Sequence, residues 1–282
     1  MSATRRAILP KRLGTDRTLP EADVDVASPG RAALITIVHN EKFFLPIWLR
    51  YYAPFFAAED IYVFDHDSTD GSTDADGFVR IPVSHESVDH MWMRDTIQAL
   101  QHELLERYES VLVTDIDEIV VPDPRVGSLG EYIEHSTDDF VNCRGVEIVH
   151  VQVEEPAYDP SRRILDQRHY WKWNAWYDKP ALARVPMNWI PGFHTRTDSA
   201  TNPDPNLYLV HLHRLDYDAC RERHRSRRQL PWNKHDFEQS WAIYNRVVEE
   251  RAFDNWFYRD LMTPGAPPFD LERIPQHWSG AF

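Results

Sequence analysis

Residues 111–122 read VLVTDIDEIVVP, and this stretch decides the fold that we expect for the chain. Its near-continuous apolar, β-branched composition, interrupted by three carboxylates, predicts a strand buried on both faces, with Pro122 ending the strand pairing. Because unpaired carboxylates are very unfavourable to bury, the three acidic residues need a cation or an open strand end. In a strand, Asp115 and Asp117 point to one side, where they offer hard oxygen ligands to Mg2+ or Mn2+, whereas Glu118 points the other way and orients the loop or a neighbouring cation. The alternative is that all three are solvated residues at a strand-to-loop turn.

Strands and helices alternate upstream of this stretch. Strands are predicted at residues 32–38, 61–64 and 80–83, and helices at 44–53 and 95–108. This order predicts βαβ units and an α/β fold, with a mostly parallel sheet flanked by helices. Ligands of such sheets bind outside the carboxyl ends of the strands. Three polar stretches each follow a strand, and we expect them to meet along one edge: 39–41, 65–70 and 115–118.

The pattern changes along the chain. Residues 1–30 contain three prolines, several charges and little periodicity, which predicts a loosely ordered arm. Residues 31–215 hold the α/β domain, with strands at 146–153 and 207–213 around long aromatic loops at 155–206. Residues 216–282 are predicted to form a helical extension packed on this domain.

Composition restricts the partners and the location. The net charge of −14 argues against a nucleic-acid binder. No apolar run approaches the roughly 18 residues of a membrane helix, and the first 22 residues contain no secretory signal. The two cysteines, Cys143 and Cys220, form no CxxC motif, which favours a reduced, cytoplasmic location.

The arginines of residues 221–228 form a basic cluster, which we interpret as a solvated helix face. The alternative is attraction to anionic lipid or to a phosphorylated acceptor, which leaves a peripheral contact with the inner face of a membrane open. The members of this cluster are Arg221, Arg223, Arg225, Arg227 and Arg228.

Residues 65–73, DHDSTDGST, invite comparison with a calcium loop, which their spacing excludes. Counting from Asp65, the glycine comes one position late, and counting from Ser72, position twelve is Val83 instead of glutamate. Two interpretations remain. The segment is either a turn rich in Asp, Ser and Gly, or a loop that brings Asp65 to the base or ribose of a nucleotide.

Later residues offer further ligands. His211 and His213 lie two apart at a strand end, so either could complete a metal site begun by carboxylates, or both could be ordinary surface or core histidines. Lys179, Arg184 and His194 lie in the long aromatic region. A cation there could hold a diphosphate or simply balance surface acid.

Together these motifs resemble the GT-A fold glycosyltransferases, specifically the bacterial family 2-like group. Residues 37–41 (IVHNE), 65–72 (DHDSTDGS) and 115–118 (DIDE) match that group in kind, order and separation. Lys179, the Gly-x-His of residues 192–194 and His211 look like its later motifs, so the resemblance covers roughly residues 32–220.

The resemblance implies a GT-A (Rossmann-like) domain that uses Mn2+ or Mg2+ to transfer a sugar, with inversion, from a UDP-sugar to a saccharide or glycolipid acceptor, as in polysaccharide biosynthesis. The metal ligands would be Asp115 and Asp117 with His211 or His213. The base would be Glu147, Asp178 or His194, among which the sequence does not choose. The expected nucleotide-sugar contacts are His39, Asn40, Glu41, Asp65, Asp67, Asp70, Arg94, Asp115 and Lys179.

Two other functions were weighed. A sugar nucleotidyltransferase would carry a glycine-rich loop after its first strand, where this chain has His39-Asn40-Glu41-Lys42. A non-catalytic sugar- or nucleotide-binding module of the same fold fits the absence of the Glu-Asp signature that many family members show after residue 150. The intact pair Asp115 and Asp117 argues against such a module.

Overall fold

The computed structural model describes residues 31–198, 202–242, 244, 250–258 and 271–282. The expected arm, residues 1–30, lies outside the described residues. The helices are α1 (Phe44–Tyr52), α2 (His90–Leu104), α3 (Leu129–His135), α4 (Tyr217–Arg227), α5 (Lys234–Glu238) and α6 (Glu250–Tyr258). The strands are β1 (Ala32–Val38), β2 (Ile61–His66), β3 (Val79–Val83), β4 (Ser110–Val113), β5 (Glu118–Pro122), β6 (Phe140–Val149), β7 (Tyr170–Trp173), β8 (Lys179–Ala183), β9 (Asp204–Arg214) and β10 (Glu272–Arg273).

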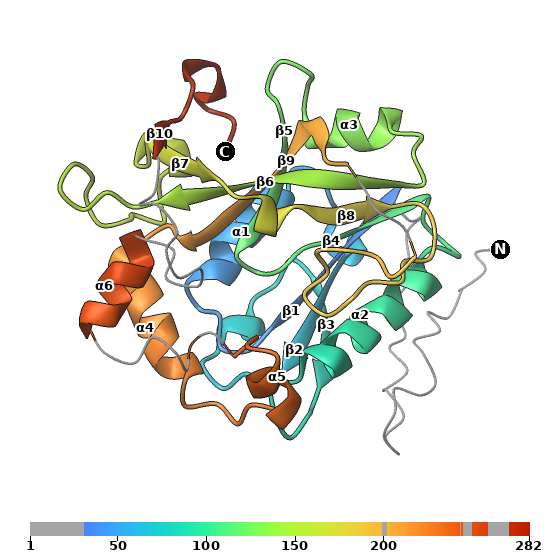
Figure 1. Ribbon diagram of the computed structural model, residues 1–282. Helices are drawn as coiled ribbons and strands as arrows, with labels where there is room; N and C mark the ends of the chain where they lie inside the picture. The colour runs from blue at the N-terminus through green and yellow to red at the C-terminus, as the bar shows by residue number, and fades with distance from the viewer. Residues whose placement is uncertain (1–30, 199–201, 243, 245–249, 259–270) are drawn as a thin grey trace.

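The α/β fold with a mostly parallel central sheet flanked by helices is confirmed (Figure 1). The strands β3-β2-β1-β4 form a parallel block, and the sheet continues from β4 through β8, β6 and β7 to β10 with antiparallel pairs. Strand β9 pairs in parallel with β6 and antiparallel with β5. The parallel block therefore contains the strand ends that the sequence predicts to form the site.

Strand β1 is buried on both faces, which explains its sequence AALITIV, apolar except for Thr36. Leu34 packs on the side of α1, together with Trp48. Ile35 packs on the opposite side against α2, together with Leu100. Helices α1 and α2 thus cover opposite faces of the block. On each face, burial of a large apolar side chain stabilises the folded state by roughly 1.5–3 kcal/mol.

Helix α2 begins earlier than the predicted residue 95. The Asp89 side chain accepts hydrogen bonds from the backbone N–H groups of Met91 and Trp92, so the helix is capped there and starts at His90. Helix α1 matches its prediction closely, with Pro46 in the first turn, where its missing N–H is tolerated.

The single strand predicted for residues 111–122 is wrong. Strand β4 ends at Val113 and β5 begins at Glu118, because the acidic residues form a turn instead of continuing the ladder. The Glu118 side chain accepts from the Asp115 N–H at 2.8 Å, and the Glu118 N–H donates to the Asp115 carbonyl at 3.1 Å. The chain uses this turn to pass from its parallel partner β1 to its antiparallel partner β9. Strand alternation therefore does not relate the directions of Asp115 and Asp117.

The second half also differs in its boundaries. Strand β6 covers residues 140–149 instead of 146–153, and β9 begins at 204 instead of 207. Helices α4 and α6 lie side by side, with Tyr217, Phe253 and Phe257 packed between them (Figure 1). Strand β10 pairs with β7, so this part of the chain adds a strand to the sheet as well as helices. Within the described ranges, no helix is both long and apolar enough to cross a membrane.

Candidate active site

The ends of β1 and β2 are joined by side-chain hydrogen bonds. Asn40, in the left-handed region at φ 54°, accepts from the N–H groups of Thr69 at 2.7 Å and Asp70 at 3.1 Å. Asparagine tolerates this conformation better than most residues. The ring nitrogen Nδ1 of His39 donates to the His66 carbonyl at 2.6 Å. The two polar stretches therefore meet at one edge of the sheet, as the sequence predicts.

The Asp65 side chain stabilises the loop that follows β2 by hydrogen bonds. Its carboxylate accepts from the Ser68 N–H at 3.0 Å, the Thr73 hydroxyl at 2.9 Å and Arg80 Nε at 2.7 Å. Burial raises the pKa of Asp65, but these hydrogen bonds outweigh burial and lower it overall. The predicted contact of Asp65 with a nucleotide base stays a prediction.

Two other acidic residues of this loop have different surroundings. Asp70 accepts from the Lys42 N–H at 3.1 Å and from Ser72, so it also ties the β1 and β2 ends together. Asp67 is exposed, in the left-handed region at φ 52°. Their predicted contacts with a nucleotide-sugar stay predictions.

Asp115 and Glu118 share one buried cation. Lys179 at the start of β8 donates to Asp115 Oδ2 at 2.8 Å and to Glu118 Oε2 at 2.7 Å. Burial would lower the pKa of Lys179, but the two carboxylates outweigh burial and raise it. Lys179 is 1% exposed, whereas the Asp115 side chain remains 38% exposed. Glu118 thus orients the turn and a neighbouring cation, as the sequence predicts, but it shares that cation with Asp115, whereas the prediction placed Glu118 on the opposite side from Asp115.

Asp117 and Glu41 share a second cation, Arg223 on α4. Arg223 donates to Asp117 Oδ2 at 2.5 Å and to Glu41 Oε1 at 3.0 and 2.8 Å, and Arg227 also pairs with Glu41. Burial would raise the pKa of Asp117, but Arg223 and the nearby imidazoles hold it well below its usual range. The sequence prediction missed these arginines.

The interpretation of the basic cluster as a solvated face is therefore wrong for Arg223 and Arg227. Their spacing of four residues puts both on one face of α4, the face turned toward Glu41. Arg225, whose side chain is 54% exposed, does lie on the solvated side. One feature of the sequence could have indicated these arginines: Glu41 and Asp117 follow buried strands, and buried carboxylates need a cation as a partner.

Asp117 lies close to both candidate histidines. The distance from Asp117 Oδ2 is 3.8 Å to His211 Nε2 and 3.6 Å to His213 Nδ1, and one ligand atom from each of the three residues lies within 4.8 Å of the others. The Tyr177 ring stacks on the His211 ring with centroids 4.2 Å apart. Asp117 thus lies beside both predicted histidines, whereas the Asp115 carboxylate forms an ion pair with Lys179.

Glu147 is fully buried beneath this group. Its Oε1 lies 3.4 Å from His211 Nδ1, and its Oε2 pairs with Arg214. Burial raises the pKa of Glu147, but Arg214 and His211 outweigh burial and lower it. A buried, ion-paired carboxylate has no access to an acceptor hydroxyl, so Glu147 does not fit the predicted role of base.

Asp178 and His194 lie beside each other on the same side of the site. His194 Nδ1 donates to the Asp178 carbonyl at 3.2 Å, and the Asp178 carboxylate accepts from the Gly145 N–H at 2.7 Å. Burial, reinforced by Lys179, lowers the pKa of His194 to about 4, so its ring is neutral at pH 7. Gly145 is required here because a Cβ would lie 2.5 Å from the Asn174 carbonyl oxygen.

Arg94 lies in the second turn of α2 and forms an ion pair with Asp95 at 2.7 Å. Nearby on this helix, the Trp92 ring contacts the His66 ring at a centroid distance of 5.0 Å. The contact of Arg94 with a nucleotide-sugar stays a prediction.

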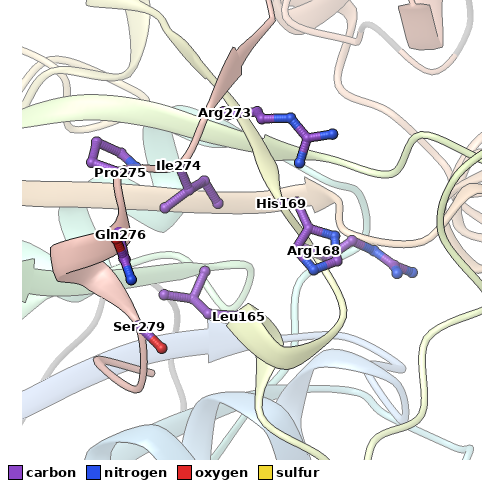
Figure 2. Close-up of a pocket in the computed structure, with 8 residues that line it drawn as sticks. All are labelled: Leu165, Arg168, His169, Arg273, Ile274, Pro275, Gln276 and Ser279. Carbon is purple, nitrogen blue, oxygen red and sulfur yellow. The ribbon is translucent and has the colours of Figure 1, made fainter.

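A separate cavity of about 310 Å³ lies between the start of β7 and the C-terminal segment (Figure 2). Its lining includes Arg168, His169 and Arg273 and none of the predicted site residues. Arg168 is held by the Leu215 carbonyl at 2.6 Å and by Asp216 at 3.5 Å. This cavity is distinct from the carboxylate group at the strand ends.

No protein-family model matches the chain, and no curated protein matches it. Among solved structures, the chain is similar to the apo form of the glycosyltransferase GlyE from Streptococcus pneumoniae TIGR4, with 10% identity and a TM-score of 0.29. The similarity covers 82% of this chain and 44% of that one. A similarity of this size carries no argument about function, which has to come from the site.

Proposed function

We infer that the chain is a metal-dependent glycosyltransferase, which transfers a sugar from a nucleoside diphosphate sugar, such as a UDP-sugar, to a saccharide or glycolipid acceptor. The observation that carries this proposal is the group formed by Asp117 and His211 beside Asp115. This group lies at the edge where three polar strand ends meet, the place where ligands of parallel α/β sheets bind.

The donor atoms of this group suit Mn2+ or Mg2+. Asp117 would supply a carboxylate oxygen and His211 would supply Nε2, while Asp115 is the exposed carboxylate beside them. Glu147 lies at the other nitrogen of His211, the arrangement by which an outer carboxylate orients a ligating imidazole. A donor set of carboxylate and imidazole favours Mn2+ over Mg2+, because Mg2+ prefers oxygen ligands alone. A metal bound here would stabilise the negative charge that develops on a diphosphate leaving group.

Lys179 and Arg223 would help to hold the diphosphate. Both are buried cations, each already shared between two carboxylates of the site. They offset locally the repulsion that a chain of net charge −14 would exert on phosphate. Arginine also offers the planar fork that matches phosphate oxygens.

His194 is the base that we favour for proton removal from the acceptor. A carbonyl oxygen only accepts, so the bond to Asp178 places the proton on Nδ1 and leaves Nε2 able to take one. Burial and Lys179 lower the pKa of His194, so its ring is neutral across the physiological pH range, and the same shift makes it a weaker base. Trp176, which is 76% exposed and precedes Tyr177, offers a face on which an acceptor sugar could stack.

One observation favours a second candidate, a non-catalytic nucleotide-sugar-binding module. Both carboxylates of the Asp-x-Asp turn are already neutralised, Asp115 by Lys179 and Asp117 by Arg223. A module that had lost its chemistry could keep these pairs for stability. Hydrolysis of a UDP-sugar separates the candidates, because slow metal-dependent turnover is expected of the transferase and none of the module.

Isothermal titration with UDP and Mn2+ tests the proposal. We expect binding that requires Mn2+ and that is lost in Asp117→Ala and in Asp115→Ala. Asp218→Asn, which changes a side chain that is 70% exposed on α4, is the matched control and should bind as the wild type does. Binding that is independent of metal, or that survives Asp117→Ala unchanged, would overturn the assignment.

A further inference from the structure

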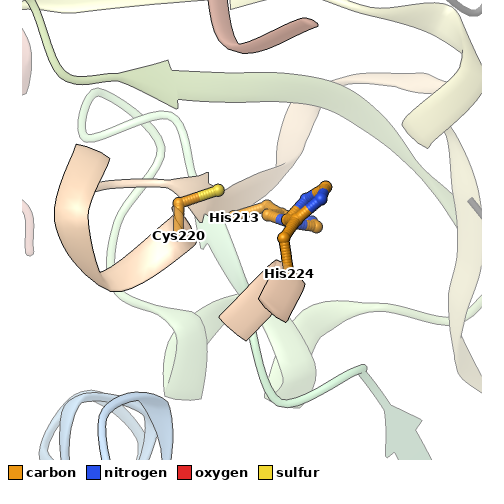
Figure 3. Close-up of side chains that lie close together, drawn as sticks. All are labelled: His213, Cys220 and His224. Atoms are coloured by element: carbon orange, nitrogen blue, oxygen red, sulfur yellow. The ribbon is translucent and has the colours of Figure 1, made fainter. Parts of the chain in front are cut away.

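A second cluster of metal-ligating side chains lies behind the candidate active site (Figure 3). It consists of His213, Cys220 and His224, all buried, with one ligand atom from each lying within 4.8 Å of the others. His213 Nε2 and His224 Nε2 are 3.1 Å apart. Figure 3 shows the Cys220 sulfur directed toward the two imidazole rings.

The local fold accounts for this convergence. Cys220 and His224 are four residues apart on α4, so they lie on the same face of the helix, one turn from each other. His213 comes from the end of β9, the strand immediately before α4. Arg223, which pairs with Asp117, lies between Cys220 and His224 in sequence.

We propose that His213, Cys220 and His224 bind a zinc ion that fastens α4 to β9. Two imidazoles with a thiolate form a typical zinc donor set, in which a water molecule can occupy the fourth position. Tetrahedral Zn2+ with Zn–N bonds of about 2.0–2.1 Å places two nitrogen ligands about 3.3 Å apart, close to the observed separation. On binding, the Cys220 thiol loses its proton to solvent and ligates as the thiolate.

The surroundings match those of a metal site. His213 Nδ1 faces Asp117 Oδ2 at 3.6 Å, and a carboxylate at the second nitrogen commonly orients a zinc-bound imidazole. The rings of Trp256 and Phe253 lie 4.3 and 5.2 Å from that of His224 and shield the cluster from bulk solvent. The thiolate would offset one of the two positive charges of the ion. His224 Nδ1 is buried and has no hydrogen-bond partner among the described residues.

The competing explanation is a hydrogen bond between two neutral imidazoles beside a free thiol. Metal content decides between them. Protein purified without added metal should contain about one zinc per chain by mass spectrometry, and Co2+ exchanged into it should show the thiolate charge-transfer band and the strong visible bands of tetrahedral cobalt. Zinc at trace level, with no such cobalt spectrum, would overturn the proposal.

Variants assign the ligands. Cys220→Ser should lose the charge-transfer band and most of the zinc, whereas Cys143→Ser, which changes the other buried cysteine, should keep both. If Cys220→Ser does not fold, Co2+ titration of chelated wild type against His224→Gln makes the same comparison. Equal spectra from wild type and His224→Gln would refute the site.

The zinc site does not rest on the proposed transferase activity, because its assay contains no nucleotide. His211→Gln separates the two sites. It should weaken UDP and Mn2+ binding and leave the zinc content at the wild-type level. Loss of zinc in His211→Gln would contradict the proposal, because it would mean that His211 also binds the zinc ion.

Discussion

The two halves of the molecule bring opposite charges to the same site. The parallel block and the turn that follows it supply the carboxylates of Glu41, Asp115 and Asp117. The later half supplies the cations Lys179 and Arg223. Because a buried ion that loses its partner is strongly destabilising, neither half can keep its site charges buried without the other.

The two halves also differ in how their residues are held in place. The β1 and β2 ends are joined by backbone N–H groups that donate to the Asn40 side chain across 29 residues, and Asp65 accepts from Ser68 within the loop that follows β2. The later half is joined to the first by ion pairs over long sequence separations, 106 residues for Arg223 and Asp117. We therefore expect substitutions in the later half to alter the arrangement of the first half only when they break one of these ion pairs.

The largest effect is expected at Arg223. Arg223→Met leaves Glu41 and Asp117 buried with less compensation, and we expect a loss of about 3–5 kcal/mol in the free energy of unfolding. Urea denaturation followed by circular dichroism measures it. Arg225→Met, at an exposed position on the same helix, should change stability by less than about 0.5 kcal/mol. Equal stability of the two variants would show that the halves do not depend on this cation.

A smaller effect is expected at Lys179, because one of its partners is half-exposed. Lys179→Met leaves Glu118 buried, but Asp115 can be solvated, so we expect a loss of about 2–3 kcal/mol. Adding Glu118→Gln to Lys179→Met should recover part of it, because the uncompensated buried charge is then removed. A double variant less stable than Lys179→Met would contradict this account of the ion pair.

These contrasts explain what the sequence could predict. The strand at residues 32–38 was confirmed because every residue of it is buried and all except Thr36 are apolar, so local pattern and burial agree. The run at 111–122 looked equally continuous, yet it breaks at the carboxylates because their cations come from distant segments. The convergence of three polar strand ends followed from the order of the elements. The role of Arg223 could not be predicted because its partners, Glu41 and Asp117, are distant in sequence and come close only in the folded chain. In the sequence alone, nothing distinguishes Arg223 from the solvated Arg225 on the same helix.

Acid should weaken the later half before it affects Asp115 and Asp117, whose pKa values are depressed. Burial lowers the pKa of His224 to about 3, whereas an unfolded histidine titrates near 6.5. Below that pH the unfolded chain binds the proton and the folded chain does not, so stability falls as the pH decreases. Between pH 7 and 5, His224 should account for about 2 kcal/mol of lost stability in metal-free protein.

Urea denaturation at both pH values, in the presence of a chelator, measures this loss. His224→Gln should reduce the difference between the two pH values, whereas His135→Gln, which changes an exposed histidine, should not. An unchanged pH dependence in His224→Gln would mean that His224 does not stay neutral in the folded protein. The range stops at pH 5 because the depressed pKa values of Asp115 and Asp117 affect stability only below about 3.8.

The smallest effect concerns Asp89, whose two oxygens serve different halves. One oxygen caps α2 through the N–H groups of Met91 and Trp92, and the other accepts from Asn233 at 2.8 Å. Asp89→Ser keeps a capping hydroxyl but removes the second contact, and Asp89→Ala removes both. We expect Asp89→Ala to be less stable than Asp89→Ser by about 1 kcal/mol, the usual value of an N-cap.

Comparison of these two variants with Asn233→Ala, which removes the contact between the halves and keeps the α2 cap, separates the local contribution from the long-range one. If Asp89→Ser and Asn233→Ala lose the same amount of stability, that loss belongs to the bond between the halves. If Asp89→Ser is as unstable as Asp89→Ala, the cap contributes nothing. The start of α2 at His90 would then depend on its contacts with the later half instead of on its own sequence.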